Sequence, residues 1–182
     1  MVRIRVPLLA ITALLSLASA RSLAQESPRF SGAWTLDPEQ SDDIDAKINT
    51  SIAGMNVIVR QVARPRLRST NVPYPRLVFS FDENVNVEMP GYPTVASPAN
   101  GQPVFWHRRT GGPCTEMRRS CVVVTTTWED RALVQTFRSE DGQRQNVFTV
   151  SPDGTTLTMV VTMTSPRLPA PLVYRLVYTR PS

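Results

Sequence analysis

The second half of the sequence is a regular series of short runs rich in β-branched and aromatic residues, and few folds can accommodate such a series. Five runs are present, at residues 120–128, 131–137, 143–150, 155–163 and 172–179. The Asp-Gly pairs at 141–142 and 153–154 supply the positive φ angles that tight hairpins require. We therefore expect five antiparallel strands joined in sequence order, mostly by short turns.

Two of these runs alternate between an apolar face and a more polar face. From Leu157 onward, the odd-numbered positions of run 155–163 are Leu, Met, Val and Met, whereas the even-numbered positions are mostly threonine. In run 172–179 the even-numbered positions are Leu, Tyr, Leu and Tyr. A period of two predicts half-buried strands whose apolar face is turned inward.

The first half of the chain is less regular. Strands are expected at residues 30–36, 56–62, 76–81, 85–89 and 103–109. Two stretches rich in proline, 63–75 and 90–102, are expected to be long loops. Many short strands are therefore predicted here as well, with little room for helices.

One short helix is compatible with residues 41–55. Ser41 would be its N-cap, and two aspartates would follow in its first turn, where negative charge is favourable. Ile44, Ile48 and Ile52 recur at helical spacing. We expect this apolar stripe to pack on the barrel rather than to bind a ligand.

The nine or ten candidate strands need an arrangement that leaves few exposed sheet edges. An up-and-down barrel, in which the last strand pairs with the first, removes those edges. We therefore predict an all-β fold, an antiparallel up-and-down barrel of about 8–10 strands with a short helix after the first strand. In such a barrel Trp34 can plug one end, and Gly32 lets the chain pass closely under a neighbour.

The N-terminus has the pattern of an export signal. Arg3 and Arg5 precede an apolar run at residues 6–20. That run is shorter than the roughly 20 residues that span a bilayer as a helix. A cleaved signal peptide is therefore favoured over an uncleaved membrane anchor, and no later segment is apolar enough to span a membrane as a helix.

Two cleavage sites fit this signal, after Ala20 and after Ala24. Cleavage after Ala24 is preferred. We therefore predict a signal peptide at residues 1–24 and a single barrel domain at residues 25–182. The predicted location is periplasmic or extracellular.

The net charge of +5 overstates how basic the processed protein would be. Arg3, Arg5 and Arg21 lie in the predicted signal, so 17 of the 20 basic residues remain against 15 acidic residues. The remaining arginines are scattered, whereas a nucleic-acid-binding protein shows a basic stripe interleaved with aromatic residues. We therefore expect no nucleic acid among the partners.

The chain has two cysteines, Cys114 and Cys121. An even pair in an oxidising compartment predicts a disulfide across a short loop. Free thiols and a redox or metal site are the alternatives. A redox pair is more often Cys-x-x-Cys, and a zinc site lacks ligands because His107 is the only histidine. We expect no metal and no cofactor.

The segment SGAWTLDPEQS contains a Gly-x-Trp motif, and the C-terminal half contains TTTWEDRALVQTF, NVFTVSPDGTTLTMVVTM and YRLVYTR. Together these segments resemble the lipocalin-like family, in particular small exported bacterial proteins that begin with such a strand and end in such a meander. The resemblance covers residues 30–41 and 121–180, and residues 42–119 lie outside it. It implies a calycin-like barrel.

In lipocalins an arginine on the closing strand packs across the first tryptophan. The resemblance therefore implies a structural set formed by Gly32, Trp34 and Arg180. Arg175 is the alternative arginine, but Arg180 shares the parity of the residues of run 172–179 that are expected to face inward. Its guanidinium would stack on the indole and bond to backbone carbonyls.

Aromatic and methionine side chains can line a ligand pocket or simply fill a core, and a small barrel is near the size at which both occur. Six candidates for lining a lumen are Trp128, Phe148, Met159, Met163, Tyr174 and Tyr178. If the lumen is open, we expect these residues to contact a small hydrophobic molecule.

No catalytic motif stands out. The sequence has no nucleophile elbow, zinc helix signature, phosphate loop or dinucleotide fingerprint. His107 lies beside two arginines that disfavour its protonated form, and we expect an ordinary surface histidine. The aspartates at 42, 43 and 45 lack the Gly and distal Glu of a calcium loop, so a helix start explains them better.

Three functions remain in view. The first is an exported barrel that binds a small apolar ligand in its lumen. The second is a non-enzymatic envelope protein with a filled barrel, whose long loops at 63–75 and 90–102 contact a protein partner of unknown identity. The third and least favoured is an enzyme in the barrel mouth, because no acid–base pair is evident.

Overall fold

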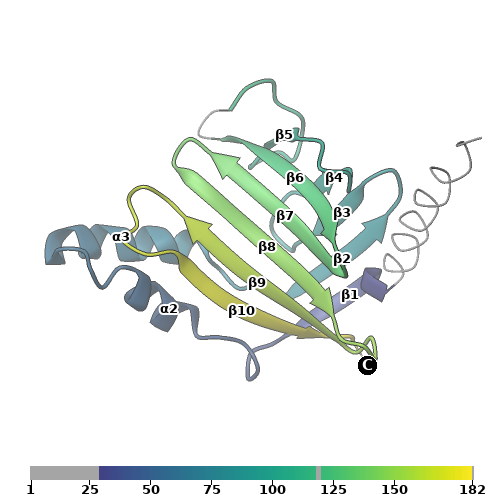
Figure 1. Ribbon diagram of the computed structural model, residues 1–182, viewed down its shortest axis with the longest axis horizontal. Coiled ribbons are helices and arrows are strands. Elements are labelled where there is room, and N and C mark those ends of the chain that lie inside the picture. The colour runs from purple at the N-terminus through teal and green to yellow at the C-terminus, as the bar shows by residue number, and fades with distance from the viewer. Residues whose placement is uncertain (1–28, 118–119, 182) are drawn as a thin grey trace, which may run out of the picture.

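The computed structural model describes residues 29–117 and 120–181. The predicted signal peptide at residues 1–24 and both of its cleavage sites lie outside these residues. The described chain forms one antiparallel sheet of ten strands that curls into a nearly closed barrel (Figure 1). The predicted all-β barrel is therefore confirmed, with a strand number at the upper end of the expected range.

The strands are β1 Gly32–Asp37, β2 Arg76–Phe81, β3 Val85–Glu88, β4 Val95–Ser97, β5 Val104–His107, β6 Cys121–Glu129, β7 Ala132–Ser139, β8 Gly142–Val150, β9 Thr156–Thr164 and β10 Leu172–Thr179. Their spatial order is β4-β3-β2-β1-β10-β9-β8-β7-β6-β5. The first strand therefore pairs with the last, as an up-and-down barrel requires. All five strands expected in the second half are present.

The barrel comes near to closing where the edge strand β4 approaches β6, the neighbour of the other edge strand, β5. Ser97 Oγ and Thr126 Oγ1 lie 2.5 Å apart and are both buried. The backbone N–H of Gly101 donates to the Thr126 carbonyl at 2.9 Å, and Asn100 forms an isolated bridge with Thr127. These contacts bring the loop before β5 against the middle of β6 and nearly close the barrel.

Strand β4 lies inside the segment 90–102, which the sequence predicts to be a loop. That prediction is wrong for three residues, because Val95 is fully buried and pairs with Val87 of β3. The prolines and glycine around it confine the strand to this short length, since proline cannot donate to a strand ladder.

Two helices, α2 Ile44–Ser51 and α3 Val57–Thr70, lie between β1 and β2. The predicted short helix is thus confirmed as α2, but its N-cap is Asp43, whose carboxylate accepts from the N–H groups of the two residues following Ile44. Ser41 is not the cap, because its hydroxyl donates to the Asp37 carbonyl and accepts from Val177 N. Within the described ranges, neither helix has the length and apolarity needed to cross a bilayer.

The predicted strand at residues 56–62 is wrong, because these residues belong to the start of α3. The β-branched residues Val57, Ile58 and Val59 favour strands in general. Here the side chain of Asn56 accepts from Val59 N at 2.9 Å and begins a helix instead. The helix runs through Pro65 to Thr70, so most of the predicted loop 63–75 is helical as well.

The barrel core consists of the inward-facing residues that the alternation predicts. Leu157, Met159 and Val161 of β9 are almost completely buried, and so are the Leu and Tyr residues of β10. Ile48 of α2 and Ile52, the residue that caps its C-terminus, belong to the same cluster and are also fully buried. The isoleucine stripe therefore packs on the barrel, as expected.

The predicted disulfide is confirmed. Cys114, in the loop after β5, is bonded to Cys121, the first residue of β6. Replacing both cysteines by serine should lower the free energy of unfolding by about 2.5 kcal/mol, since a loop this short loses that much closure entropy on cross-linking. Urea unfolding under non-reducing conditions measures the loss.

The control for this prediction is the wild-type protein in reducing agent, which should unfold at the same urea concentration as the double variant. A difference of less than about 0.5 kcal/mol between wild type and variant would contradict it, because substitutions that remove no structural feature change stability by that much.

Candidate functional site

The interior of the barrel is largely filled by its own side chains. Of the six predicted lumen residues, Phe148, Met159, Tyr174 and Tyr178 are at most 1% exposed, whereas Trp128 and Met163 are half-buried. A lumen open to water would leave its lining side chains accessible. The barrel therefore has no open lumen beside these four residues. A ligand would need side chains to move, or would lie beside half-buried Trp128 and Met163.

Gly32, Trp34 and Arg180 lie together where β1 pairs with β10. The Arg180 guanidinium lies 4.3 Å from the centre of the Trp34 ring. A Cβ at Gly32, whose φ is +100°, would lie 3.5 Å from Arg180 Nη1. Arg175 instead donates to the Gln40 carbonyl on the outside. Arg180 also donates to three backbone carbonyls, those of Arg29, Ser31 and Gly154.

A band of buried polar side chains, which was not among the predicted features, crosses the inside of the sheet. Thr126 of β6 pairs with Gln135 of β7, which pairs with Asn146 of β8. All three are at most 4% exposed. The signal was present in the sequence, because Asn146 shares the parity of Phe148, which was expected to face inward.

Arg144 of β8 follows the same parity and brings a positive charge into the barrel. Its Nε donates to Asn146 Oδ1 at 2.9 Å, and its Nη1 donates to the Thr70 carbonyl at the end of α3 at 3.2 Å. Its Nη2 is buried and has no hydrogen-bond partner. Among the described residues, no carboxylate forms an ion pair with Arg144.

Three tyrosines, Tyr74, Tyr174 and Tyr178, lie near enough to this guanidinium for its charge to act on their pKa. Tyr174 donates its hydroxyl to Asn71 Oδ1 at 3.1 Å, and the Tyr178 hydroxyl is buried without a partner. Burial raises the pKa of Tyr74, Tyr174 and Tyr178, and the positive charge of Arg144 opposes that rise at each of them. The three phenols thus stay neutral donors close to a cation, an arrangement suited to holding an anion.

We call the polar side chains around this guanidinium the Arg144 cluster. Its members are Arg144, which is half-buried, and four buried residues, Asn71, Asn146, Tyr174 and Tyr178. They come from the end of α3, from β8 and from β10. Two of their polar atoms, Arg144 Nη2 and Tyr178 Oη, lack a partner. Buried polar atoms without partners are rare in folded proteins, and an absent water, ion or ligand commonly explains them.

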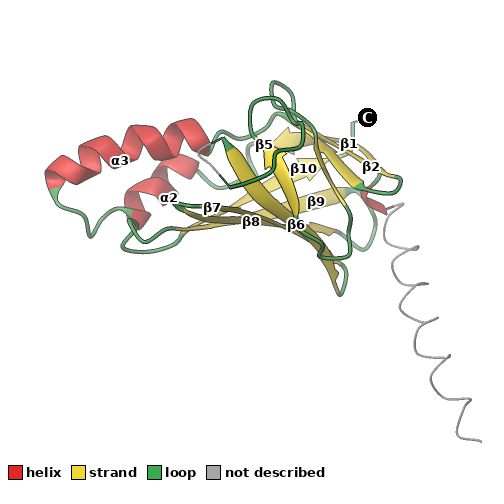
Figure 2. Cartoon of the chain, turned by 90° about the horizontal axis from the view of Figure 1, so that it is seen from above, coloured by secondary structure: helices red, strands yellow, loops and turns green. Residues whose placement is uncertain are grey.

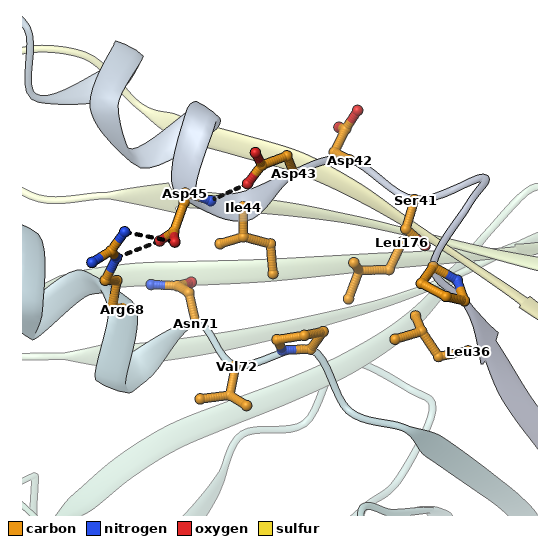
Figure 3. A pocket seen from close by; sticks show the side chains of 12 residues that line it. Leu36, Ser41, Asp42, Asp43, Ile44, Asp45, Arg68, Asn71, Val72 and Leu176 are labelled. Atoms are coloured by element: carbon orange, nitrogen blue, oxygen red, sulfur yellow. Dashed lines mark hydrogen bonds and ion pairs between the residues drawn. The ribbon is translucent and has the colours of Figure 1, made fainter.

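A cleft of about 540 Å³ lies between the two helices and the barrel (Figure 3). Its apolar wall consists of Leu36, Ile44, Val72 and Leu176, together with two prolines. Asp45 of α2 and Arg68 of α3 form an ion pair at its rim, with Arg68 Nη2 2.6 Å from Asp45 Oδ2. That pair raises the pKa of Arg68.

Asn71 connects the cleft with the Arg144 cluster. It lines the cleft, it is only 2% exposed, and its amide oxygen accepts from the Tyr174 hydroxyl. Leu176, on the same strand as Tyr174, also lines the cleft. Asn71 is therefore shared by the cleft and the Arg144 cluster.

The aspartates before and within α2 are engaged in structural contacts. Asp43 caps the helix, Asp42 Oδ2 accepts from Arg175 N at 2.8 Å, and Asp45 pairs with Arg68. The part of the chain that the structure describes holds no group of His, Cys, Asp and Glu suited to a metal ion. His107 lies at the end of β5, where its Nδ1 accepts from Thr110 N.

Comparisons with known proteins place the chain by fold. No family model and no curated protein matches the sequence. The structure is similar to fatty-acid-binding protein 1 of Echinococcus granulosus, with a TM-score of 0.51 and 13% identity, over 85% of this chain and 99% of that one. It is also similar to a secretory abundant heat soluble protein of Ramazzottius varieornatus, with a TM-score of 0.54 and 11% identity, over 84% of this chain and 96% of that one. At these identities the likeness is one of fold, the calycin-like barrel.

Proposed function

We propose that the protein is an exported barrel that binds a small apolar molecule bearing a negatively charged group. The charged group would lie at Arg144, and the apolar part would lie among the inward-facing side chains. The observation that carries this proposal is the buried Arg144 Nη2, which has no hydrogen-bond partner and faces no carboxylate among the described residues. An anionic ligand would supply both the missing acceptor and the missing counter-charge.

The neighbouring polar groups support an anion at this place. Tyr178 Oη is the second buried atom without a partner, and Tyr174 and Tyr74 offer further hydroxyls near the guanidinium. The fold neighbour from Echinococcus granulosus is named for binding fatty acids, which are apolar molecules with one carboxylate. That name agrees with the ligand class that the Arg144 cluster suggests.

Ligand entry would require local movement, because most of the interior is filled. The cleft shares Asn71 with the Arg144 cluster, and the Arg68–Asp45 pair joins the two helices across it. Both side chains of that pair are about half exposed, and exposed ion pairs contribute little to stability. Met163, paired with Arg144 across β8 and β9, is half-buried and flexible enough to make room.

Export is proposed on two grounds. Residues 1–24 have a basic start, an apolar run and a cleavage site, the pattern of a signal peptide. The Cys114–Cys121 disulfide persists only where the compartment is oxidising. N-terminal sequencing of the protein recovered from the producing cell tests cleavage after Ala24, and cleavage after Ala20 is the alternative.

A second candidate function is that of a non-enzymatic envelope protein with a permanently filled barrel. The near-complete burial of Phe148, Met159, Tyr174 and Tyr178 favours it. It predicts that no small molecule binds in the interior and that a protein partner binds to the outer surface.

Binding of oleic acid and oleyl alcohol separates the two functions. The processed protein is titrated with each at neutral pH, and its tryptophan fluorescence, to which half-buried Trp128 beside Phe81 contributes, reports on binding. We expect one site that prefers the acid by about ten-fold or more, since hydrogen bonds to a charged group contribute about 1.5–3 kcal/mol. Equal affinities for oleic acid and oleyl alcohol would contradict the proposed anion site. If neither molecule binds, the second function, that of a filled barrel, is favoured.

A further inference from the structure

Helix α3 projects from the barrel (Figure 2) and carries exposed apolar side chains in its first two turns. None of its residues is buried. Ala63 and Leu67 lie on the side that packs against the core, whereas Ile58 and Val62 lie on the opposite side, as helical spacing requires. The exposed apolar residues at its start are 47–77% exposed; they are Val57, Ile58, Val59 and Val62.

The same helix is strongly basic. It carries Arg60, Arg64, Arg66 and Arg68 and has no acidic residue. The whole segment 46–81 contains six basic residues and no Asp or Glu. Among the described residues, only Arg68 of this helix forms an ion pair, with Asp45.

The fold does not explain why these side chains are exposed. Isolated apolar residues on a surface are common, but four within the first two turns of one helix form a patch. β-Branched residues also weaken a helix slightly, so Val57, Ile58 and Val59 do not strengthen α3. An apolar face flanked by arginines on a helix is the pattern of a segment that lies in the interface of an anionic membrane.

We propose that α3 docks on the surface of a phospholipid bilayer that contains anionic lipids. Ile58 and Val62, with Val59 beside them, enter the boundary between headgroups and acyl chains. Arg64 and Arg66, which are both exposed, bind lipid phosphates, whereas half-buried Arg60 lies on the side of Ala63 and Leu67. This proposal holds whether or not a ligand binds inside the barrel. The C-terminal part of the same helix borders the cleft through Arg68.

The charge pattern selects a lipid surface over the other possible occupants. A second copy of this chain would bring the same acid-free basic helix, and four arginines would repel four arginines. An anionic bilayer offers many phosphates at once and accepts a helix in many orientations, so unpaired arginines suffice without a matched partner surface.

The test is flotation of the processed protein with vesicles of phosphatidylcholine alone or with about one third phosphatidylglycerol, at low and at high salt. At low salt we expect binding to the anionic vesicles to be about ten-fold stronger than binding to vesicles of phosphatidylcholine alone. At high salt we expect this binding to be largely lost. Arg64→Gln with Arg66→Gln should weaken it about ten-fold, and so should Ile58→Ser with Val62→Ser.

The control is Val173→Ser, which removes an exposed apolar side chain from β10 and should leave flotation unchanged. All substituted residues are exposed, so matched thermal unfolding curves show that the variants fold. Equal binding to both vesicle types, or an Ile58→Ser, Val62→Ser variant that floats like wild type, would overturn the proposal. Sedimentation as a dimer that this variant converts to a monomer, without vesicle binding, would assign the face to a second copy instead.

Discussion

Replacing Trp34 by alanine is expected to lower the free energy of unfolding by about 3–5 kcal/mol, the cost of removing a large buried side chain. Trp34 is completely buried in β1, opposite Leu77 of β2. Its Nε1 donates to the Phe30 carbonyl at 2.8 Å, and the Arg180 guanidinium lies over its ring. Alanine would leave a cavity, an unpaired carbonyl and an arginine with no ring beneath it. Urea unfolding under non-reducing conditions measures the loss.

The matched control is Phe105→Ala on the edge strand β5, where the side chain is 39% exposed. We expect this variant to lose no more than about 1 kcal/mol, because its ring is only partly removed from water. A Trp34→Ala loss below about 1 kcal/mol would contradict the structural role that we propose for Gly32, Trp34 and Arg180.

Replacing Arg144 by methionine should weaken binding far more than it changes stability. Methionine fills a similar volume and removes the partnerless Nη2, but it also removes the donors to Asn146 Oδ1 and to the Thr70 carbonyl. We therefore expect the free energy of unfolding of the ligand-free protein to change by no more than about 2 kcal/mol. The same change should weaken binding of oleic acid by about 10–100-fold, because the carboxylate loses its charged donor. Oleyl alcohol should bind as it does to wild type.

The control for this variant is Arg138→Met, which removes an exposed arginine from the neighbouring strand β7. It should leave the affinity for oleic acid unchanged. If Arg144→Met loses stability and keeps its affinity, the guanidinium serves the fold through Asn146 and the Thr70 carbonyl, and the ligand assignment is wrong.

The parts of the fold that could be predicted are those specified by neighbours in sequence. The strands from β6 to β10 follow from alternation and from turns such as Asp153-Gly154, all of which act within a few residues. The inward direction of Tyr174 and Tyr178 follows from the same alternation. The position of Arg180 over Trp34 came from the lipocalin resemblance and from parity.

The parts that were missed depend on competition between local preferences or on distant contacts. Helix α3 begins with Val57, Ile58 and Val59, whose strand preference is outweighed by the cap at Asn56. Strand β4 is too short to give a pattern and exists because Val95 reaches a partner strand and a buried position.

The candidate site was only partly predictable. Tyr174, Tyr178 and Met163 were identified as inward-facing, but Arg144 was not, because charged residues are rarely buried. Its parity with Phe148 was the one signal available. The cleft could not be predicted at all, since its lining runs from Leu36 to Leu176 and depends on how α2 and α3 lie against the barrel.

The most direct test of the proposed anion site is the carbon NMR signal of oleic acid labelled with ¹³C at its carboxyl group. The protein should give one bound carboxyl resonance, and the pKa of that carboxyl should be lower than that of a carboxyl in water, because the Arg144 guanidinium favours the ionised form. This resonance should disappear or titrate normally in Arg144→Met. A bound carboxyl with an ordinary pKa in the wild-type protein, or no bound resonance, would contradict the placement of an anionic ligand at Arg144.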